Sequence, residues 1–255
     1  MFCSLPLGEE TQSIITIVLL LIPATFYIMG LMDGRLGRGL FLAGIIFHVV
    51  SMVQRGLTIG MVPLTEKHDT ISFLAFAMAL IYWYFSRQKD MQRLGDLALP
   101  LIVTTLLVAF FYEPINTLSP FFLSPWFFLH ILFYFTSYAF FGISACIGLL
   151  YLLSGRKEHE SLQYRGAVHG WILFSLSLVV GSVWFFIAYG TYWLWTSREL
   201  WATLMWSYYG AYLHARYVKD LSGRPAAIMG LLGFLVALFA YFGVGTILPS
   251  PPTQF

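Results

Sequence analysis

Histidine is the residue with the widest chemical use in this sequence, which contains six of them. An imidazole can ligate haem iron, transfer a proton or make a hydrogen bond between helices. Because an ionisable side chain is expensive to place in lipid, a histidine inside an apolar run is a functional candidate. His48 and His214 lie inside such runs, whereas His68 and His130 lie at the ends of theirs. These four residues are the candidate ligands for haem iron.

Haem is the favoured use because ligation by two histidines needs imidazoles from separate helices and flat apolar walls around the macrocycle. The 24 Phe, 15 Tyr and 8 Trp residues can supply those walls. A single histidine on an apolar helix is, however, more often a structural hydrogen-bonding group, and aromatic residues are also common on surfaces that face lipid. Taken by themselves, the residues leave haem ligation and helix packing open.

The aromatic stretch from residue 181 to residue 216 is the second feature with a definite chemical preference. It holds five of the eight tryptophans, which are Trp184, Trp193, Trp195, Trp201 and Trp206. Trp and Tyr favour the membrane interface because their rings are apolar while their N–H or O–H groups can still meet water. We therefore expect this stretch to form a flat apolar surface at the bilayer boundary, at the mouth of a helix bundle.

The elements that position these residues are predicted to be membrane-spanning helices. Of the 255 residues, 59% are hydrophobic and 10% are charged, a composition that a soluble globule cannot shield from water. Apolar runs near the length that crosses a bilayer recur at roughly 13–32, 38–55, 69–86, 96–112, 127–153, 168–189, 200–217 and 226–248. We predict an all-α, polytopic transmembrane helix bundle of about eight helices, which forms a single integral membrane domain over residues 1–255.

Charged residues indicate how this bundle is oriented in the bilayer. The net charge is +2, and Lys and Arg occur singly or in pairs between apolar runs, which argues against a nucleic-acid partner. Eleven of the fourteen Lys and Arg residues fall in alternate loops on one side, which leaves Arg55, Lys67 and Arg198 on the other. By the positive-inside rule both termini face outward. The tryptophan-rich turn at residues 189–199 then lies on the outer face.

The aromatic stretch also resembles a family motif that reads approximately G-x-x-W-A-x-x-x-W-G-x-Y-W-x-W-D-P-x-E, followed by W and then by L-H-x-R. The residues that match it in register, without a gap, are Gly181, Trp184, Gly190, Tyr192, Trp193, Trp195, Glu199, Trp201, Trp206, Tyr212, Leu213, His214 and Arg216. Residues 130–139 resemble the helix of the same family that opens with an outer His and continues to S-Y-A. On these residues the chain resembles the cytochrome c maturation haem-handling family (CcsA, ResC and CcmC type).

The resemblance implies two haem sites. The outer aromatic surface would hold one haem, with His130 as an axial ligand, on the rings of Trp184, Trp193, Trp195 and Trp201. Arg198 lies on the same face, where a guanidinium can pair with haem propionates or anchor the chain at the interface. His214 would be one ligand of a b-type haem inside the membrane.

The same resemblance implies partners and a location. Proteins of the family deliver haem to the CxxCH motifs of apocytochrome c or hold it for attachment, often with a membrane partner of the CcsB/ResB type. We therefore expect a multi-pass protein of the bacterial inner (plasma) membrane whose functional face is periplasmic. Whether the chain is a component of a cytochrome c haem lyase stays open at this point.

The sequence departs from the family pattern in ways that bear on function. Thr196 replaces the Asp of the motif and Tyr189 replaces a Trp, so the turn loses a carboxylate. The family's synthases usually carry a second outer His after the last helix, and here no His follows His214. Either the outer haem has another ligand, or this member holds haem without transferring it. The second alternative describes a haem-binding membrane subunit or regulator with a role in b-type electron transfer or haem biosynthesis.

Two histidines have two interpretations each. His68 is either the substitute outer ligand or a solvated loop residue beside Lys67 and Asp69. His48 either faces His214 across the membrane haem, if the second and seventh helices are neighbours, or packs within the bundle.

Overall fold

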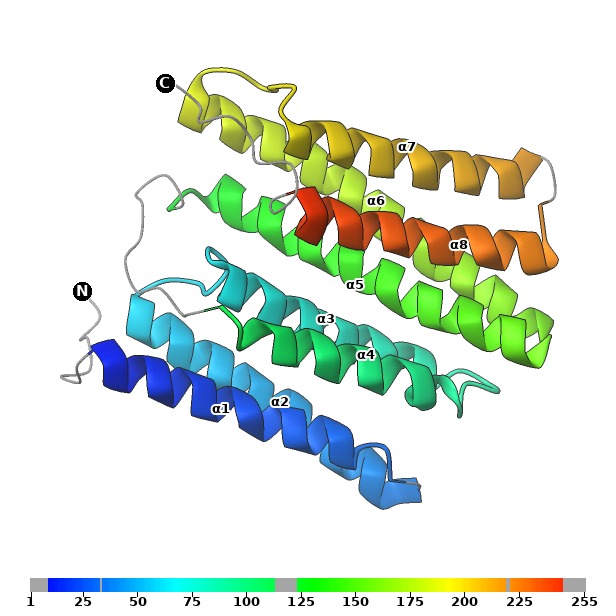
Figure 1. Cartoon of the computed structure of the whole chain (residues 1–255), viewed down its shortest axis with the longest axis horizontal. Helices are drawn as coiled ribbons and strands as arrows, with labels where there is room; N and C mark the ends of the chain where they lie inside the picture. The colour runs from blue at the N-terminus through cyan, green and yellow to red at the C-terminus, as the bar shows by residue number, and fades with distance from the viewer. Residues whose placement is uncertain (1–8, 33, 113–122, 219–220, 245–255) are drawn as a thin grey trace. The chain divides into compact units, whose positions relative to one another are not determined.

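The computed structural model describes residues 9–32, 34–112, 123–218 and 221–244 (Figure 1). Within these ranges the chain forms eight α-helices and one short π-helix, and no strand. The helices are α1 (Glu9–Met29), α2 (Gly34–Ile59), α3 (Lys67–Ser86), α4 (Leu94–Ala109), α5 (Pro125–Ser154), α6 (Lys157–Tyr189), α7 (Ser197–Val218), α8 (Gly223–Leu238) and the π-helix η2 (Phe239–Gly243). The prediction of an all-α fold with about eight helices is confirmed, and each predicted apolar run corresponds to one helix.

Five of the described helices are long and apolar enough to cross a bilayer, namely α2, α3, α5, α6 and α8 together with η2. Shorter apolar segments lie in α1 (Ile14–Met29) and in α4 (Leu94–Ala109). The helix α7 belongs to neither group because charged, hydroxyl and tyrosine side chains along it lower its hydropathy. The chain is thus a polytopic helix bundle, as predicted. The outward orientation of both termini concerns residues outside the described ranges and stays a prediction.

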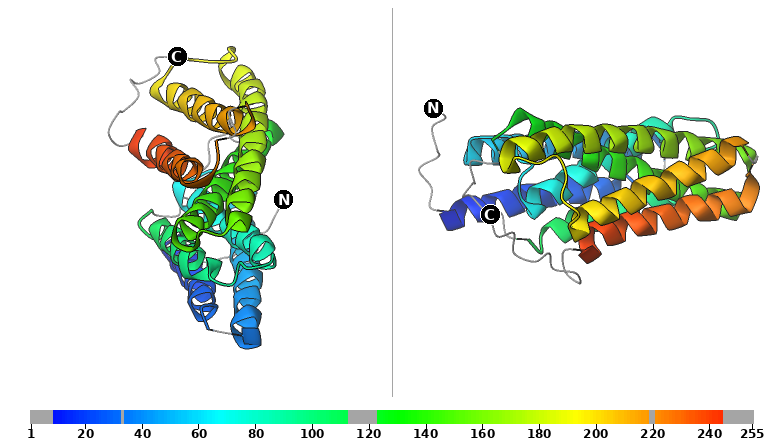
Figure 2. Two further views of the ribbon diagram at one scale, coloured as in Figure 1. Left: turned by 90° about the vertical axis from the view of Figure 1, so that its right-hand side faces the viewer. Right: turned by 90° about the horizontal axis from the view of Figure 1, so that it is seen from above.

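The chain divides into two compact units, residues 1–131 and 132–255, called here the N-terminal unit and the C-terminal unit. In the N-terminal unit α1 packs on α2 and α3 packs on α4, each pair antiparallel (Figure 1). The C-terminal unit contains most of α5 and all of α6, α7, α8 and η2, and Figure 2 shows α7 and α8 side by side and antiparallel. A single domain over residues 1–255 stays a prediction.

Glycine lets α1 and α2 pack closely in the N-terminal unit. A Cβ on Gly44 would lie 2.8 Å from the ring of Tyr27, and a Cβ on Gly30 would lie 3.0 Å from the Cβ of Phe41. Small residues at a contact between membrane helices allow the backbones to approach. Tyr27 is fully buried in this contact, and its hydroxyl reaches a polar side chain of α2.

Gln163 joins three helices of the C-terminal unit. Its Nε2 donates to the carbonyl of Ala227 on α8 (3.1 Å), and its backbone carbonyl accepts from the Ser144 hydroxyl on α5 (2.7 Å). Gly148 and Gly230 face the Gln163 amide so closely that a Cβ on either would overlap it. Hydrogen bonds of this kind between membrane helices contribute about 1 kcal/mol each. They hold α5, α6 and α8 together near the start of α6.

Candidate functional site

A short turn, residues 190–196, connects α6 to α7 and carries two of the candidate tryptophans. Gly190 ends α6 in the left-handed conformation (φ 73°), and its N–H donates to the carbonyl of Phe186 (2.8 Å). Glycine is favoured at this position because a side chain would be strained at positive φ. The direction in which the turn leaves α6 is therefore fixed by Gly190.

Thr196 fixes the other end of the turn as the N-cap of α7. Its carbonyl accepts from the N–H of Leu200 (3.0 Å), the first hydrogen bond of the helix. Its N–H donates to Glu199 Oε2 (3.0 Å), and its hydroxyl donates to the same oxygen. This is a capping box, in which a Glu three residues after the N-cap reaches back to the N-cap N–H. Asp and Thr are both good N-cap residues, so the departure from the family motif keeps the helix start.

The four candidate tryptophans gather at the end of the C-terminal unit where α6 meets α7. Trp195 is 74% exposed, and its ring lies 6.0 Å from that of Trp193 at an interplanar angle of 75°. Trp184, in the last turns of α6, packs edge-on against Tyr189 (6.1 Å between ring centroids). Trp201, in the first turns of α7, packs edge-on against Phe239 of η2 (4.6 Å). Aromatic rings of α6, the turn, α7 and η2 therefore share one end of the unit.

The indole N–H of Trp193 is buried and has no hydrogen-bond partner within the described part of the chain. A buried donor without a partner costs about 1–3 kcal/mol, so such a group is an exception that calls for an explanation. An acceptor supplied by a bound molecule would satisfy it.

Exposed apolar side chains surround the turn and make it a platform. The exposed residues on the last turns of α6, the turn and the first turn of α7 are Phe186, Ile187, Tyr189, Tyr192, Trp195 and Leu200. Phe186 and Tyr192 stack on each other with ring centroids 4.4 Å apart. A contiguous exposed apolar patch marks a surface that meets lipid, a ligand or a partner.

Arg198 adds a positive charge to this end of the unit. Its side chain is exposed in the first turn of α7 and interacts electrostatically with the hydroxyl of Tyr134 on α5. Tyr134 in turn stacks on Tyr138 and is joined to it by a hydrogen bond between their hydroxyls (2.8 Å). The guanidinium thus lies near the aromatic platform, where it can meet an anionic group.

The structure places the candidate iron ligands His130 and His214 on different helices. His130 is half-buried in the second turn of α5, just before the boundary between the two units. His214 is exposed on α7, one turn before the end of that helix. The end of α7 is held on α6 by an ion pair between Arg216 Nη1 and Glu160 Oε1 (2.7 Å). Because the helix around it is fixed, the imidazole of His214 is presented at the surface of its unit.

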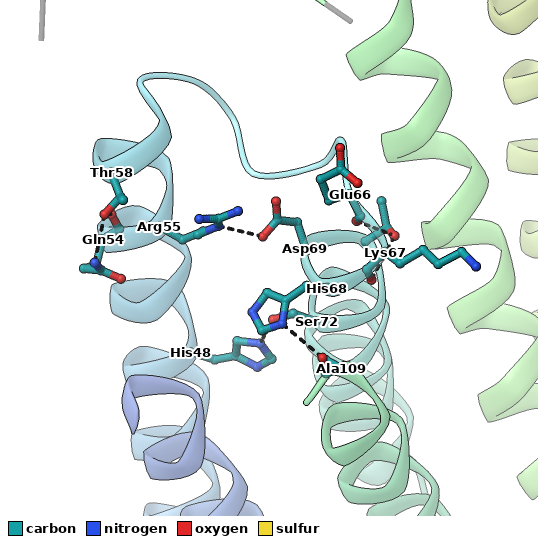
Figure 3. Close-up of polar contacts among 11 residues, drawn as sticks. His48, Gln54, Arg55, Thr58, Glu66, Lys67, His68, Asp69, Ser72 and Ala109 are labelled. Atoms are coloured by element: carbon teal, nitrogen blue, oxygen red, sulfur yellow. Dashed lines mark hydrogen bonds and ion pairs between the residues drawn. The ribbon is translucent and has the colours of Figure 1, made fainter. Parts of the chain in front are cut away.

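His48 lies in the core of the N-terminal unit, with both ring nitrogens engaged. Its Nδ1 is hydrogen-bonded to the Tyr27 hydroxyl (3.0 Å). Its Nε2 is hydrogen-bonded to the Ser72 hydroxyl (3.0 Å), and Figure 3 shows His48 beside Ser72. An imidazole needs a free nitrogen lone pair to ligate iron. The observed contacts therefore favour the packing alternative for His48.

His68 is buried in the first turn of α3 rather than solvated in a loop. Its Nδ1–H donates to the carbonyl of Ala109 on α4 (3.0 Å), so Nε2 is the nitrogen with the lone pair (Figure 3). The next residue, Asp69, forms a buried ion pair with Arg55 on α2 through a contact of 3.0 Å. The sequence does not predict this pair, because Arg55 stands at the end of an apolar run and counts among the charges of the outer side, whereas it is a buried residue of α2.

Comparisons with known proteins identify the family of this chain. The family model described as "Cytochrome C assembly protein" matches residues 64–249. The cytochrome c biogenesis protein CcsA of Prochlorococcus marinus (strain MIT 9312) is 27% identical over 226 residues, which cover 72% of this chain and 73% of that protein. CcsA of Guillardia theta is 25% identical, with 90% and 91% covered, and CcsA of Chlamydomonas reinhardtii is 28% identical, with 78% and 62% covered. Since the family model spans well over half of the sequence, the chain belongs to the cytochrome c assembly protein family.

Proposed function

We propose that this chain takes part in cytochrome c maturation by holding haem on the platform of residues 184–201 and presenting it for attachment to apocytochrome c. The observation that carries the proposal is the turn itself. Gly190 and Thr196 fix both of its ends, yet Trp195 is left 74% exposed and the N–H of Trp193 has no partner within the described residues. A rigid turn that keeps a large apolar ring out of the core is suited to binding a flat apolar molecule.

The chemistry of these residues fits haem, which is the cargo of the proposed reaction. Haem has a planar apolar ring and two carboxylates at one edge. Trp195 and Trp201 offer aromatic surface for the ring, while the N–H of Trp193 and the guanidinium of Arg198 are donors for a propionate. Apolar rings with a few convergent polar groups are the usual composition of a cofactor site.

Histidines complete the proposal as ligands of the iron. His130 is the proposed outer ligand, with His68 as the candidate for the second, and His214 is the proposed ligand of a b-type haem inside the membrane. The contacts of His48 with Tyr27 and Ser72 leave it the weaker candidate for the partner of His214. When bound, haem supplies vinyl groups to which cysteine thiols add. The chain's own part is to hold the ring, orient its vinyl edge and keep the iron ligated.

The proposal includes a location and a partner. The platform lies on the outer, periplasmic face of a bacterial plasma membrane, in keeping with the charge distribution. A membrane protein of the CcsB/ResB type is the proposed partner. The exposed apolar residues of α6, such as Ile172, Leu176 and Val179, offer a surface for lipid and for such a protein.

A second function is haem retention without transfer, as in a haem-binding subunit or regulator. Thr196 favours it, because the family motif that the chain resembles has an Asp there, whereas this chain carries a hydroxyl bonded to Glu199.

Co-expression of the full chain with an apocytochrome c and a CcsB/ResB-type partner tests the proposal and separates the two functions. Covalent haem on the apocytochrome, lost in Trp195→Ala and His130→Ala, supports haem transfer. Haem bound to the chain with no covalent product in any partner context supports retention. The matched control is His169→Ala, because His169 is exposed on α6 and its Nδ1 bonds within the helix to the carbonyl of Arg165 (2.6 Å). Protein that folds without haem in cells that have ample haem contradicts both functions.

A further inference from the structure

A small cavity lies inside the N-terminal unit, where α1, α2 and α3 meet. Its volume is about 10 Å³, close to the space that one water molecule needs. Each helix contributes residues one turn apart to the wall, namely Thr16 and Leu20, Ser51 and Arg55, and Asp69 and Ser72. Residues three or four apart lie on the same face of a helix, so three helix faces converge on this space.

Asp69 has an oxygen that the described residues do not satisfy. Its Oδ1 accepts from Nε of Arg55 (3.0 Å), and Figure 3 shows this contact between α2 and α3. Its Oδ2 is buried and has no hydrogen-bond partner in the described ranges of the chain. Asp69 itself is 3% exposed, so bulk solvent does not reach that oxygen. A buried carboxylate oxygen needs a donor, because leaving it unpaired in a low-dielectric interior is unfavourable.

The charges at the cavity select the kind of molecule that can supply this donor. Arg55 and Asp69 together are neutral, so this ion pair has no net charge that would attract a cation or an anion. His68 cannot supply the donor for Asp69 from its Nδ1–H, because that group already donates to the carbonyl of Ala109. A neutral molecule of the size of water that both donates and accepts meets these conditions.

The remaining polar groups on the wall give such a molecule enough partners. The hydroxyls of Thr16, Ser51 and Ser72 line the same space as Asp69. A buried water typically makes about three hydrogen bonds to polar groups that would otherwise be unsatisfied. The site therefore has both the volume and the partners for one molecule.

We propose that this cavity binds one water molecule, which donates to Asp69 Oδ2 and bonds to the hydroxyl of Ser72. Ser72 is already hydrogen-bonded to His48, and His48 to Tyr27. The bound water thus joins the Arg55–Asp69 ion pair to the Ser72–His48–Tyr27 chain. The result is one continuous polar network that ties α1, α2 and α3 together inside the apolar bundle.

Water suits this position because it can adapt to either tautomer of His48. If Nε2–H donates to Ser72, the Ser72 hydroxyl can donate to the water. If Ser72 donates to Nε2, its oxygen can accept from the water instead. The network stays complete in both cases. The inference concerns the N-terminal unit alone and does not depend on haem binding.

X-ray radiolytic labelling of the full chain in lipid nanodiscs tests the proposal, because a bound water yields a hydroxyl radical that oxidises the nearest sulfur. Met52 lines the cavity and is half-buried, whereas Met78, on α3, is 1% exposed and does not line it, so the effect of Ser51→Val on Met52 is the deciding comparison. We expect several-fold more sulfoxide at Met52 than at Met78. In Ser51→Val, whose added methyl groups fill the cavity, labelling of Met52 falls several-fold while labelling of Met78 is unchanged.

Equal labelling of Met52 and Met78 in the wild type overturns the proposal, and so does labelling of Met52 that Ser51→Val leaves unchanged. If Ser51→Val does not fold, an atomic-resolution map of the wild-type chain decides. A density peak within hydrogen-bond distance of Asp69 Oδ2 supports the bound water, and an empty cavity excludes it. Neither readout involves haem, so both are independent of the proposed function.

Discussion

The carboxylate of Glu199 caps the start of α7, because its Oε2 accepts from both the N–H and the hydroxyl of Thr196. This contact holds the tryptophan-rich turn in place from the α7 side, as Gly190 does from the α6 side. The position of Trp193 and Trp195 therefore depends on local backbone chemistry as well as on helix packing.

Thr196→Ala should lower the free energy of unfolding by about 1 kcal/mol, because Ala cannot cap the helix. Thr196→Asp, which restores the residue of the family motif, should lose less than Thr196→Ala, because Asp is a good N-cap residue even though its carboxylate cannot donate to Glu199 Oε2. Chemical unfolding followed by tryptophan fluorescence measures both. Equal losses in Ala and Asp variants would show that the cap does not stabilise α7.

The buried Arg55–Asp69 pair should be costly to break on one side. Arg55→Met or Asp69→Leu alone leaves an unpaired buried charge and should lower the free energy of unfolding by about 3–5 kcal/mol. The double variant removes both charges and should lose much less. Thermal unfolding of the wild type, the two single variants and the double variant gives the coupling energy through a double-mutant cycle. Additive losses in the double variant would contradict a direct ion pair.

Trp195→Ala should weaken haem binding without weakening the fold. The side chain is 74% exposed, so its loss removes aromatic contact with haem of about 1 kcal/mol, roughly fivefold in the dissociation constant. Titration of the detergent-extracted chain with haem measures the change.

The matched control is Trp171→Ala. The indole of Trp171 donates to the carbonyl of Trp206 (3.1 Å) and stacks on its ring at 5.4 Å, away from the turn. This variant should lose stability and keep its affinity for haem. The reverse pattern between the two variants would move the binding surface from the turn to the middle of α6 and α7.

Gly230→Ala should destabilise the C-terminal unit, because the new methyl group would overlap the amide of Gln163. Overpacking of this kind typically costs about 1–3 kcal/mol. The control is Gly39→Ala on α2, where a Cβ meets no atom within 4 Å. There the higher helix propensity of Ala should leave stability unchanged or raise it by about 0.5–1 kcal/mol. Thermal unfolding compares the stability of the two variants. If Gly230→Ala leaves the stability unchanged, the close contact between Gly230 and the Gln163 amide is contradicted.

The helices could be predicted from the sequence because apolar runs of spanning length are a strong signal. The start of α6 could not, since the helix begins at Lys157 and the apolar run begins about residue 168. The intervening turns are polar but bury Glu160 against Arg216 and Gln163 against Ala227. A hydropathy scale scores Glu160 and Gln163 as charged and polar. It does not take into account their partners Arg216 and Ala227, which lie more than fifty residues away in the sequence.

The environments of the histidines show the same limit. From the sequence, His48 is a possible iron ligand, because nothing near it in the apolar run indicates a hydrogen-bond partner for its imidazole. Its partners Tyr27 and Ser72 come from two other helices, 21 and 24 residues away. The cap at Thr196 is different, because Thr-x-x-Glu before an aromatic run is a sequence signal for a capping box. The cap formed by Thr196 and Glu199 could therefore be predicted from the sequence, even though Thr196 lacks the carboxylate of the family motif.

The most direct test of haem handling is the absorption spectrum of the purified full chain, compared with His130→Ala, His214→Ala and His48→Ala. The wild type should show the Soret and α bands of a haem with two histidine ligands. His130→Ala and His214→Ala should reduce these bands while the protein stays folded, and His48→Ala should lower the thermal stability and keep the bands in the folded fraction. Folded wild-type protein without a Soret band, or full bands in all three variants, would contradict the account.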